Sequence, residues 1–179
     1  CIDDTLLDYL TQLARQTMVT LEYGIETAND DTLRLIRRGH DFQCVRDAVE
    51  RTKGRGIVIG GHVILGLPGE DAEESVRQAT IMSELGLDVL KIHQMQIIRG
   101  TRLAQMYAEN PFHLYSPEEY SELIVRYLEH LSDDMVVERF ASQSPKEMLI
   151  APKWGLKNYE LTNLIVNKMK REGRRQGSL

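Results

Sequence analysis

The stretch Gly60-Gly61-His62-Val63-Ile64-Leu65-Gly66-Leu67-Pro68-Gly69-Glu70-Asp71 decides the fold of this 179-residue chain. Its apolar residues lie between glycines, a pattern typical of a short strand buried on both faces of a parallel sheet. Gly66 and Gly69 can adopt a positive φ, and Glu70 and Asp71 place negative charge in the first turn of the next helix. Ligands bind at this end of a strand in parallel α/β folds, although an ordinary tight turn explains the same pattern.

Composition and charge narrow the class of protein. Hydrophobic residues make up 42% of the chain and charged residues 27%, as in an ordinary globular domain. The net charge of −5 gives no support for a nucleic-acid-binding surface, and no apolar run approaches the roughly 20 residues that span a bilayer. The start, Cys1-Ile-Asp-Asp, has neither a signal-peptide pattern nor an initiator methionine. We therefore expect the middle of a longer, cytoplasmic protein.

Helical and strand-like patterns alternate along the chain. Apolar stripes at helical spacing occupy residues 3–16, 29–36, 41–53, 71–85, 100–107, 117–131 and 158–171, and strand-like runs occupy residues 17–25, 57–65, 87–98 and 135–140. This order predicts an α/β fold of right-handed βα units on a parallel sheet. Four strands cannot close a barrel, so we expect part of a barrel or a small open sheet. The basic run at residues 170–175 is expected to fray.

Polar residues interrupt two of the predicted strands. Glu22 and Glu26 share one face by period two, which indicates either a solvated strand end or a ligand site. Lys91, His93 and Met95 alternate on one face of the next-but-one strand. A single histidine on such a face is more often a core residue, but the lysine two positions away favours a polar pocket.

Two arginines follow the short helix at residues 29–36. Arg37 and Arg38 precede Gly39, which is a plausible left-handed helix stop, and positive charge suits a helix C-terminus. An anion-binding arginine explains the same pattern equally well.

Four motifs in order carry a family resemblance. They are Leu-Glu-Tyr-Gly-Ile-Glu-Thr-Ala-Asn-Asp (residues 21–30), Ile-Arg-Arg-Gly-His (36–40), His-Val-Ile-Leu-Gly-Leu-Pro-Gly-Glu (62–70) and Lys-Ile-His (91–93). Together they resemble the second half of a radical S-adenosylmethionine (SAM) enzyme. The branch most similar to this chain is a bacterial group related to the catalytic subunit of elongator and to oxygen-independent coproporphyrinogen oxidase.

The resemblance implies the C-terminal part of a partial (β/α)6 TIM-like barrel. Residues 1–140 would carry strands four to six of the barrel, and residues 141–179 would form a mainly helical extension packed on it. The family's Cys-x3-Cys-x2-Cys loop, which holds a [4Fe–4S] cluster, is absent, and Cys1 and Cys44 cannot supply it. We therefore expect no metal ligands in this chain and a cluster held by residues upstream of it.

Site roles follow from the resemblance, position by position. Glu26 stands where relatives usually have a glutamine that faces the ribose hydroxyls of SAM, and Arg38 matches the arginine that pairs with the methionine carboxylate. His62 falls near the ribose. Gly66 and Leu67 match the turn that packs on adenine, where a side chain at Gly66 would block the approach.

The resemblance further implies that Glu22, Lys91 and His93 point into the barrel, toward the substrate or the methionine moiety of SAM. The implied activity is the reductive cleavage of SAM to a 5′-deoxyadenosyl radical that abstracts hydrogen from an unknown substrate. An electron donor such as flavodoxin or ferredoxin would serve the cluster. RNA as the substrate rests only on the similarity to elongator.

Two other functions fit the residues. The chain could be a non-catalytic α/β domain that binds a nucleotide or a partner, and three cysteines upstream at the family spacing would argue against it. It could also be a lyase that uses Lys91 as a Schiff-base amine, which requires a desolvated lysine with a lowered pKa. Because strands preceding residues 17–25 are missing from the chain, we expect it to self-associate or to cover that strand edge.

Overall fold

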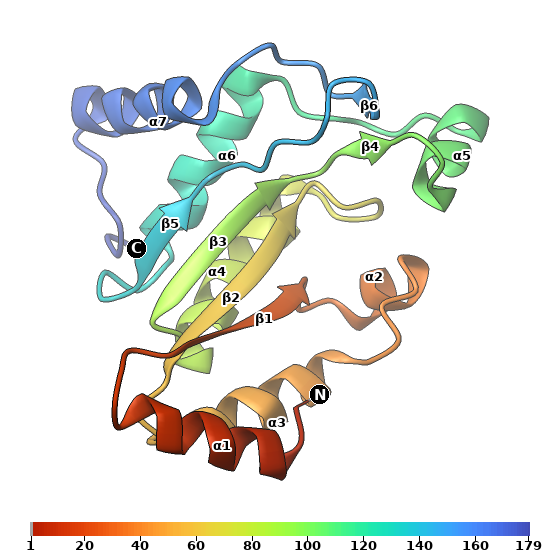
Figure 1. Ribbon diagram of the computed structural model, residues 1–179. Coiled ribbons are helices and arrows are strands. Elements are labelled where there is room, and N and C mark those ends of the chain that lie inside the picture. The colour runs from red at the N-terminus through yellow and green to blue at the C-terminus, as the bar shows by residue number, and fades with distance from the viewer. Residues whose placement is uncertain (1) are drawn as a thin grey trace.

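The computed structural model describes residues 2–179, so Cys1, where the family resemblance begins, lies outside the described residues. Helices and strands alternate as predicted (Figure 1). The helices are α1 (Asp4–Ala14), α2 (Asp30–Leu35), α3 (Phe42–Thr52), α4 (Ala72–Leu85), α5 (Arg102–Glu109), α6 (Pro117–Glu129) and α7 (Asn158–Glu172). The strands are β1 (Thr20–Glu26), β2 (Val58–Leu65), β3 (Val89–Gln94), β4 (Ile97–Ile98), β5 (Val136–Arg139) and β6 (Leu149–Ala151).

An open parallel sheet is the centre of the fold. Its four strands lie in the order β1-β2-β3-β5, and each neighbouring pair is parallel. The register places Gly24 beside His62 and His62 beside Lys91, with Ile64 beside His93. The predicted α/β fold with a parallel sheet and a helical C-terminal part is thereby confirmed.

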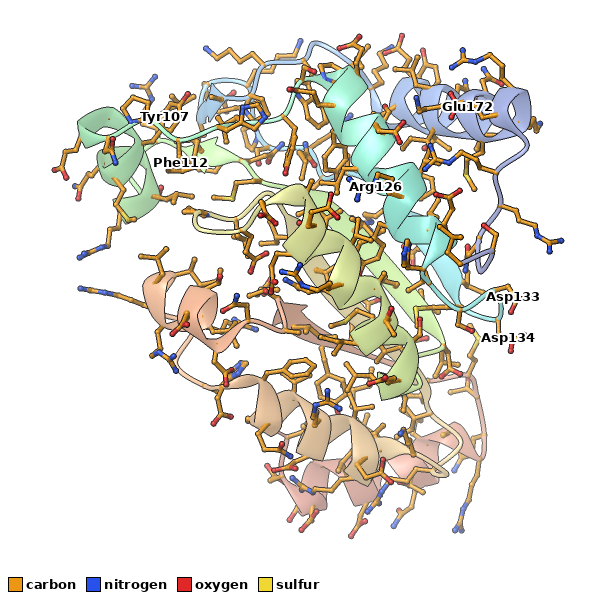
Figure 2. All side chains as sticks on the ribbon, turned by 180° about the vertical axis from the view of Figure 1, so that it is seen from behind. Tyr107, Phe112, Arg126, Asp133, Asp134 and Glu172 are labelled. Carbon is orange, nitrogen blue, oxygen red and sulfur yellow. The ribbon has the colours of Figure 1, made fainter. Side chains whose placement is uncertain are left out.

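The two faces of the sheet differ in chemistry. Helices α4 and α6 lie behind the sheet in Figure 1, and Figure 2 shows them in front when the molecule is turned. Their apolar residues join those of the strands in one core, which includes Val63, Ile92 and Ile124. Gly61 also faces this core, where an added Cβ would lie 2.7 Å from Leu87 and 2.8 Å from Ile25. The opposite face carries the polar residues of the strands.

The strand expected at residues 87–98 is divided, which corrects the prediction. β3 ends at Gln94, and Ile97–Ile98 form β4, which pairs antiparallel with β6 in a separate small sheet. The ladder to β5 has already ended, since β5 stops at Arg139. The Gln94 side chain instead exchanges hydrogen bonds with the backbone of Ser142, at 2.9 and 2.8 Å, and the chain turns away.

The C-terminal segment packs on α6, and its basic end is ordered rather than frayed. Trp154 donates from Nε1 to the Tyr115 carbonyl at 2.9 Å and lies against Tyr120. Beyond α7, the Arg174 guanidinium contacts the Glu129 carboxylate through two hydrogen bonds of 2.8 and 2.6 Å. Glu122 accepts a third, at 2.9 Å. The prediction of fraying at residues 170–175 missed this anchor because charge alone does not reveal a distant partner.

Within residues 2–179, no helix has the length and apolar character needed to cross a membrane.

Candidate functional site

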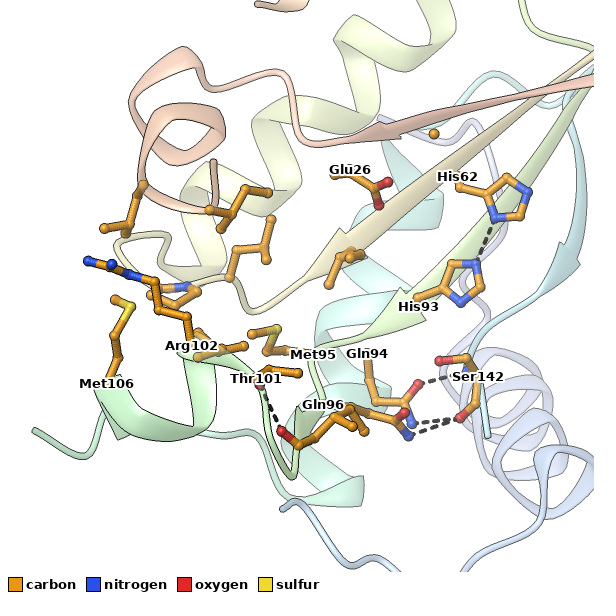
Figure 3. Close-up of a pocket in the computed structure, with 18 of the residues that line it drawn as sticks. Glu26, His62, His93, Gln94, Met95, Gln96, Thr101, Arg102, Met106 and Ser142 are labelled. Carbon is orange, nitrogen blue, oxygen red and sulfur yellow. Dashed lines mark hydrogen bonds between the residues drawn. The ribbon is translucent and has the colours of Figure 1, made fainter. Parts of the chain in front are cut away.

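A cavity of about 800 Å3 opens on the polar face of the sheet, toward the C-terminal ends of β1, β2 and β3 (Figure 3). Its polar lining comes from Glu22, Glu26, His62, His93, Gln94, Gln96, Thr101, Arg102 and Ser142. Its apolar lining comes from Leu35, Ile36, Ile64, Leu67, Pro68, Met95, Ile98, Leu103 and Met106. A cavity of this size lies within the range of about 300–1,000 Å3 that is typical of small-molecule sites.

Glu22 lies at the centre of an ion-pair network on this face. Lys91 Nζ donates to Glu22 Oε1 at 2.5 Å and lies 3.3 Å from Glu138 Oε2 on β5. The Lys91 side chain is 10% exposed, whereas that of Glu22 is 36% exposed. The lysine is therefore buried between two carboxylates that both reach solvent.

The two histidines extend this network. His62 Nε2 lies 2.7 Å from Glu22 Oε2, and His62 Nδ1 lies 3.0 Å from His93 Nε2. The two ring planes are nearly parallel, inclined by 11°, with centroids 5.2 Å apart. Because β1, β2 and β3 are adjacent and in register, residues 22, 62, 91 and 93 meet on one face, as the alternation within β1 and β3 predicts for Glu22, Lys91 and His93.

The network shifts the pKa values of its members. Hydrogen bonds from Lys91 and His62 lower the pKa of Glu22, and the hydrogen bond to Glu22 raises the pKa of Lys91 despite its burial. Burial and the neighbouring His62 lower the pKa of His93 to about 4. A Schiff-base amine requires a lowered pKa, whereas the contact with Glu22 raises that of Lys91, so the site gives the lyase hypothesis no support.

Glu26 and Arg38 form a second polar group at the end of β1. A bulge separates Gly24 from Glu26 in the pairing with β2, and Glu26 has φ +65°. Arg38 donates from Nη2 to the Gly24 carbonyl at 2.7 Å and lies 3.5 Å from Glu26 Oε1. Glu26 lines the cavity, whereas Arg38 is not among its lining residues. The buried Arg38 Nε has no hydrogen-bond partner within the described part of the chain.

In the glycine turn after β2, Leu67 lines the main cavity and Gly66 does not. Leu67 is buried, and Gly66 lies against Tyr115. At φ +86°, a Cβ added to Gly66 would lie 3.1 Å from the Tyr115 ring. Gly66 lines a smaller neighbouring cavity of about 360 Å3 instead. A side chain at position 66 would therefore disturb the packing of Tyr115, which lies outside the main cavity.

Sequence reasoning missed two groups of residues that shape the site. Ser142, in the segment after β5, closes one side of the cavity through Gln94 and Gln96, and no sequence pattern marks it. Thr27 is fully buried, and its hydroxyl donates to Glu70 Oε1 at 2.5 Å and lies 3.1 Å from Gln78 Oε1, which joins the end of β1 to α4. The polar residues within the apolar run at 94–96 were the only available signal.

No group of three or more histidine, cysteine or acidic residues within residues 2–179 is arranged to hold a metal ion. The pairs described above, Glu22 with Lys91 and His62 with His93, are engaged with one another.

Two family models match the sequence. The model described as the Radical SAM superfamily matches residues 1–78, and the Radical_SAM C-terminal domain matches residues 87–171. The first match ends within α4 and the second begins just before β3, so β1 and β2 belong to the first match and β3 to the second.

Several named proteins are similar along nearly the whole chain. The uncharacterized protein YtqA of Bacillus subtilis is 30% identical over 177 residues, which cover 99% of this chain and 55% of YtqA. Protein YhcC of Escherichia coli is 31% identical over 86% of this chain and 50% of its own length. Elongator complex protein 3 of Homo sapiens is 26% identical over 93% of this chain and 31% of its own length. The chain thus spans about half the length of the two bacterial relatives.

A solved structure shares the fold. The elongator protein Elp3 of the archaeon Methanocaldococcus infernus, with an N-terminal deletion, superposes with a TM-score of 0.79 at 22% identity. The superposition covers 94% of this chain and 40% of that protein. Because the two family models together cover most of the sequence and the fold agrees, the chain belongs to the radical SAM superfamily.

Proposed function

We propose that this chain supplies the SAM-facing part of a radical SAM active site in a longer enzyme. The cavity at the C-terminal ends of β1, β2 and β3 supports the proposal most directly, since Glu26, His62 and Leu67 all line it. The family resemblance implies that Glu26 faces the ribose hydroxyls, that Leu67 packs on the adenine and that His62 lies near the ribose. Parallel α/β folds bind ligands at this end of their strands.

The residues present fit SAM in two respects. Glu26 offers a carboxylate that can accept from both ribose hydroxyls, in place of the more common glutamine. Arg38 carries a buried Nε without a partner in residues 2–179, and the carboxylate of a bound amino acid would supply that missing acceptor. The bond from Nη2 to the Gly24 carbonyl holds the guanidinium in place beside Glu26.

The bound cofactor, together with a [4Fe–4S] cluster, supplies a 5′-deoxyadenosyl radical for hydrogen abstraction. The residues of this chain would bind SAM, orient it and shield it from water. Glu26 and Arg38 would fix the two polar ends of SAM, Leu67 and Ile64 would exclude water from the cavity, and the Glu22 network would face the substrate. The residues described here do not include cluster ligands, so the proposal assigns those to another part of the longer protein.

Equilibrium binding of SAM to the longer, anaerobically prepared protein tests this proposal. Arg38→Ala should weaken binding by roughly tenfold or more, since a charge-assisted hydrogen bond contributes about 1.5–3 kcal/mol. Arg34→Ala is the matched control, because Arg34 lies on the neighbouring helix α2, is 70% exposed and pairs only with Asp31 in the described structure. Equal SAM affinity in wild type and Arg38→Ala would remove Arg38 from the site. Failure of the wild type to bind SAM would favour the non-catalytic binding domain.

A further inference from the structure

The His93 ring ends a chain of hydrogen-bonded groups that starts at solvent-exposed Glu22. Glu22 contacts His62 Nε2 at 2.7 Å, and His62 Nδ1 contacts His93 Nε2 at 3.0 Å. His93 Nδ1 has no hydrogen-bond partner among residues 2–179, and His93 lines the cavity. The remaining charged groups of this network are Lys91 on β3 and, on β5, Glu138, which pairs with Lys91, and Arg139, whose charge acts on His93.

The positions of the protons in this series of hydrogen-bonded groups follow from the chemistry of the Glu22 carboxylate. An ionised carboxylate can only accept hydrogen bonds, so the proton between Glu22 and His62 belongs to His62 Nε2. In a neutral His62, Nδ1 is then an acceptor, and the proton of the second hydrogen bond belongs to His93 Nε2. His93 Nδ1 is left as an acceptor with a lone pair. Burial, which lowers the pKa of His93 to about 4, keeps the ring from taking a second proton.

We infer that Glu22 and His62 fix His93 in the Nε2-protonated form, so that its Nδ1 accepts a hydrogen bond from a hydroxyl or N–H group of the molecule in the cavity. Glu22 and His62 act as positioning residues in this arrangement, and His93 is the residue that touches the ligand. The inference deepens the proposed function, on which it rests only in taking this cavity as the ligand site.

The rest of the cavity defines the remainder of the ligand. Apolar residues, among them Ile64, Leu67 and Met95, lie along its wall, and Figure 3 shows Met106 at the end away from His62 and His93. The ligand class is therefore a molecule with a hydroxyl or N–H donor beside an apolar part. Both a ribose hydroxyl of SAM and a substrate hydroxyl have this chemistry, and the last experiment below separates them.

Nitrogen-15 NMR of the histidine-labelled 179-residue chain at pH 8 tests the tautomer. We expect His93 with Nε2 protonated and Nδ1 unprotonated, and a pKa for His93 well below that of a solvated histidine. Glu22→Gln should give a mixture of the two His93 tautomers, because an amide can either donate to His62 or accept from it. Glu26 lies on the same strand as Glu22 and lines the cavity, but it is not one of the hydrogen-bonded groups that lead to His93. Glu26→Gln should therefore leave the His93 signals unchanged. An Nδ1-protonated His93 in the wild type overturns the inference.

Two small molecules test whether His93 Nδ1 accepts a hydrogen bond from a ligand. Benzyl alcohol should bind the chain roughly two- to tenfold more tightly than benzyl methyl ether, which lacks the donor, in line with the net contribution of one hydrogen bond. The alcohol alone should shift the His93 Nδ1 resonance. His93→Phe, which keeps an aromatic ring, should abolish the preference. Equal affinities for the two probes, or an Nδ1 resonance that the alcohol does not move, contradict the assignment.

The same NMR measurement on the longer protein shows whether SAM or the substrate supplies the hydrogen-bond donor. If SAM alone shifts the Nδ1 resonance, the cofactor supplies the donor, and if it does not while benzyl alcohol does, the substrate supplies it. Both results support the acceptor role. A failure of SAM binding would sink the proposed function and leave the tautomer measurement on the 179-residue chain intact, so the two failures are distinguishable.

Discussion

Glu22 and Lys91 show what single residues contribute to this site. The period-two alternation within each strand placed Glu22, Lys91 and His93 on inward faces from sequence, and the resemblance added His62. Which partner each would meet was not predictable, because that depends on how β1, β2 and β3 align. The register brings Glu22 between Lys91 and His62, and this pairing turns a possible nucleophilic lysine into a structural cation.

Glu22→Gln should lower the free energy of unfolding by about 1 kcal/mol near pH 7, the upper range for a partly exposed ion pair. The folded-state pKa of Glu22 is below its ordinary value of 4.5, so the ionised carboxylate stabilises the fold above that pH. This contribution is lost as the pH falls through the lowered pKa. Denaturant unfolding between pH 3 and pH 7 should show the two proteins converging at the acid end, and a constant difference would contradict the pairing.

Gly66→Ala should destabilise the chain more than Gly69→Ala. Both glycines have positive φ, +86° and +90°, so each alanine costs about 1–2 kcal/mol of backbone strain. Only the Cβ at position 66 would also meet the Tyr115 ring, at 3.1 Å, whereas the Cβ at position 69 meets nothing within 4 Å. We expect a further loss of about 1 kcal/mol at position 66 from this crowding. Equal stabilities of the two variants in urea would show that the Tyr115 ring moves aside without a cost in free energy.

The elements themselves were mostly predictable, and their interruptions were not. Apolar periodicity indicated the helices and the parallel strands, because most of them bury one side against one core, while α5 packs on a second, smaller cluster. The break after Gln94 and the bulge at Glu26 were missed, since both depend on contacts with distant segments: Ser142 for the first and β2 for the second. The order at residues 173–179 likewise depends on α6.

Arg174→Ala should cost about 3 kcal/mol of unfolding free energy, because it leaves Glu129, whose side chain is 11% exposed, without its cationic partner. Arg171→Ala is the matched control, since that side chain is 72% exposed and contacts only Glu172 among the described residues. Hydrogen exchange should also increase in residues 173–179 of the Arg174 variant. Similar stabilities for the two variants would mean that the anchor contributes little.

The whole molecule is an open sheet whose edge strands, β1 and β5, each pair on one side only within residues 2–179. β1 has β2 on one side, and within residues 2–179 no strand pairs with its other side. Ion pairs of Asp4 with Arg51 and of Asp8 with Arg55 hold α1 beside α3, and the C-terminal segment packs on α6. The partial-barrel fold was predictable because four motifs occur in family order; the substrate was not, because no residue pattern in the cavity specifies one molecule.

The 179-residue chain should self-associate through the β1 edge, because unpaired N–H and C=O groups of an edge strand are a template for another chain. Light scattering at increasing concentration measures this. Val58 N–H donates to the Val19 carbonyl, so the backbone groups of Val19, Leu21 and Tyr23 face β2 and those of Thr20 face outward. Thr20→Pro would remove an outward backbone donor and should reduce association. A chain that stays monomeric at all concentrations would show that the β1 edge is adequately protected.

Release of 5′-deoxyadenosine from SAM tests the central claim most directly. The longer protein that contains this chain, prepared anaerobically and given a reductant, should release it, and Arg38→Ala should reduce the release roughly tenfold at SAM concentrations below the Kd, where the loss of affinity is fully expressed. Arg34→Ala should match the wild type. A protein that carries a [4Fe–4S] cluster and binds SAM, yet releases no 5′-deoxyadenosine under reducing conditions, would contradict the account.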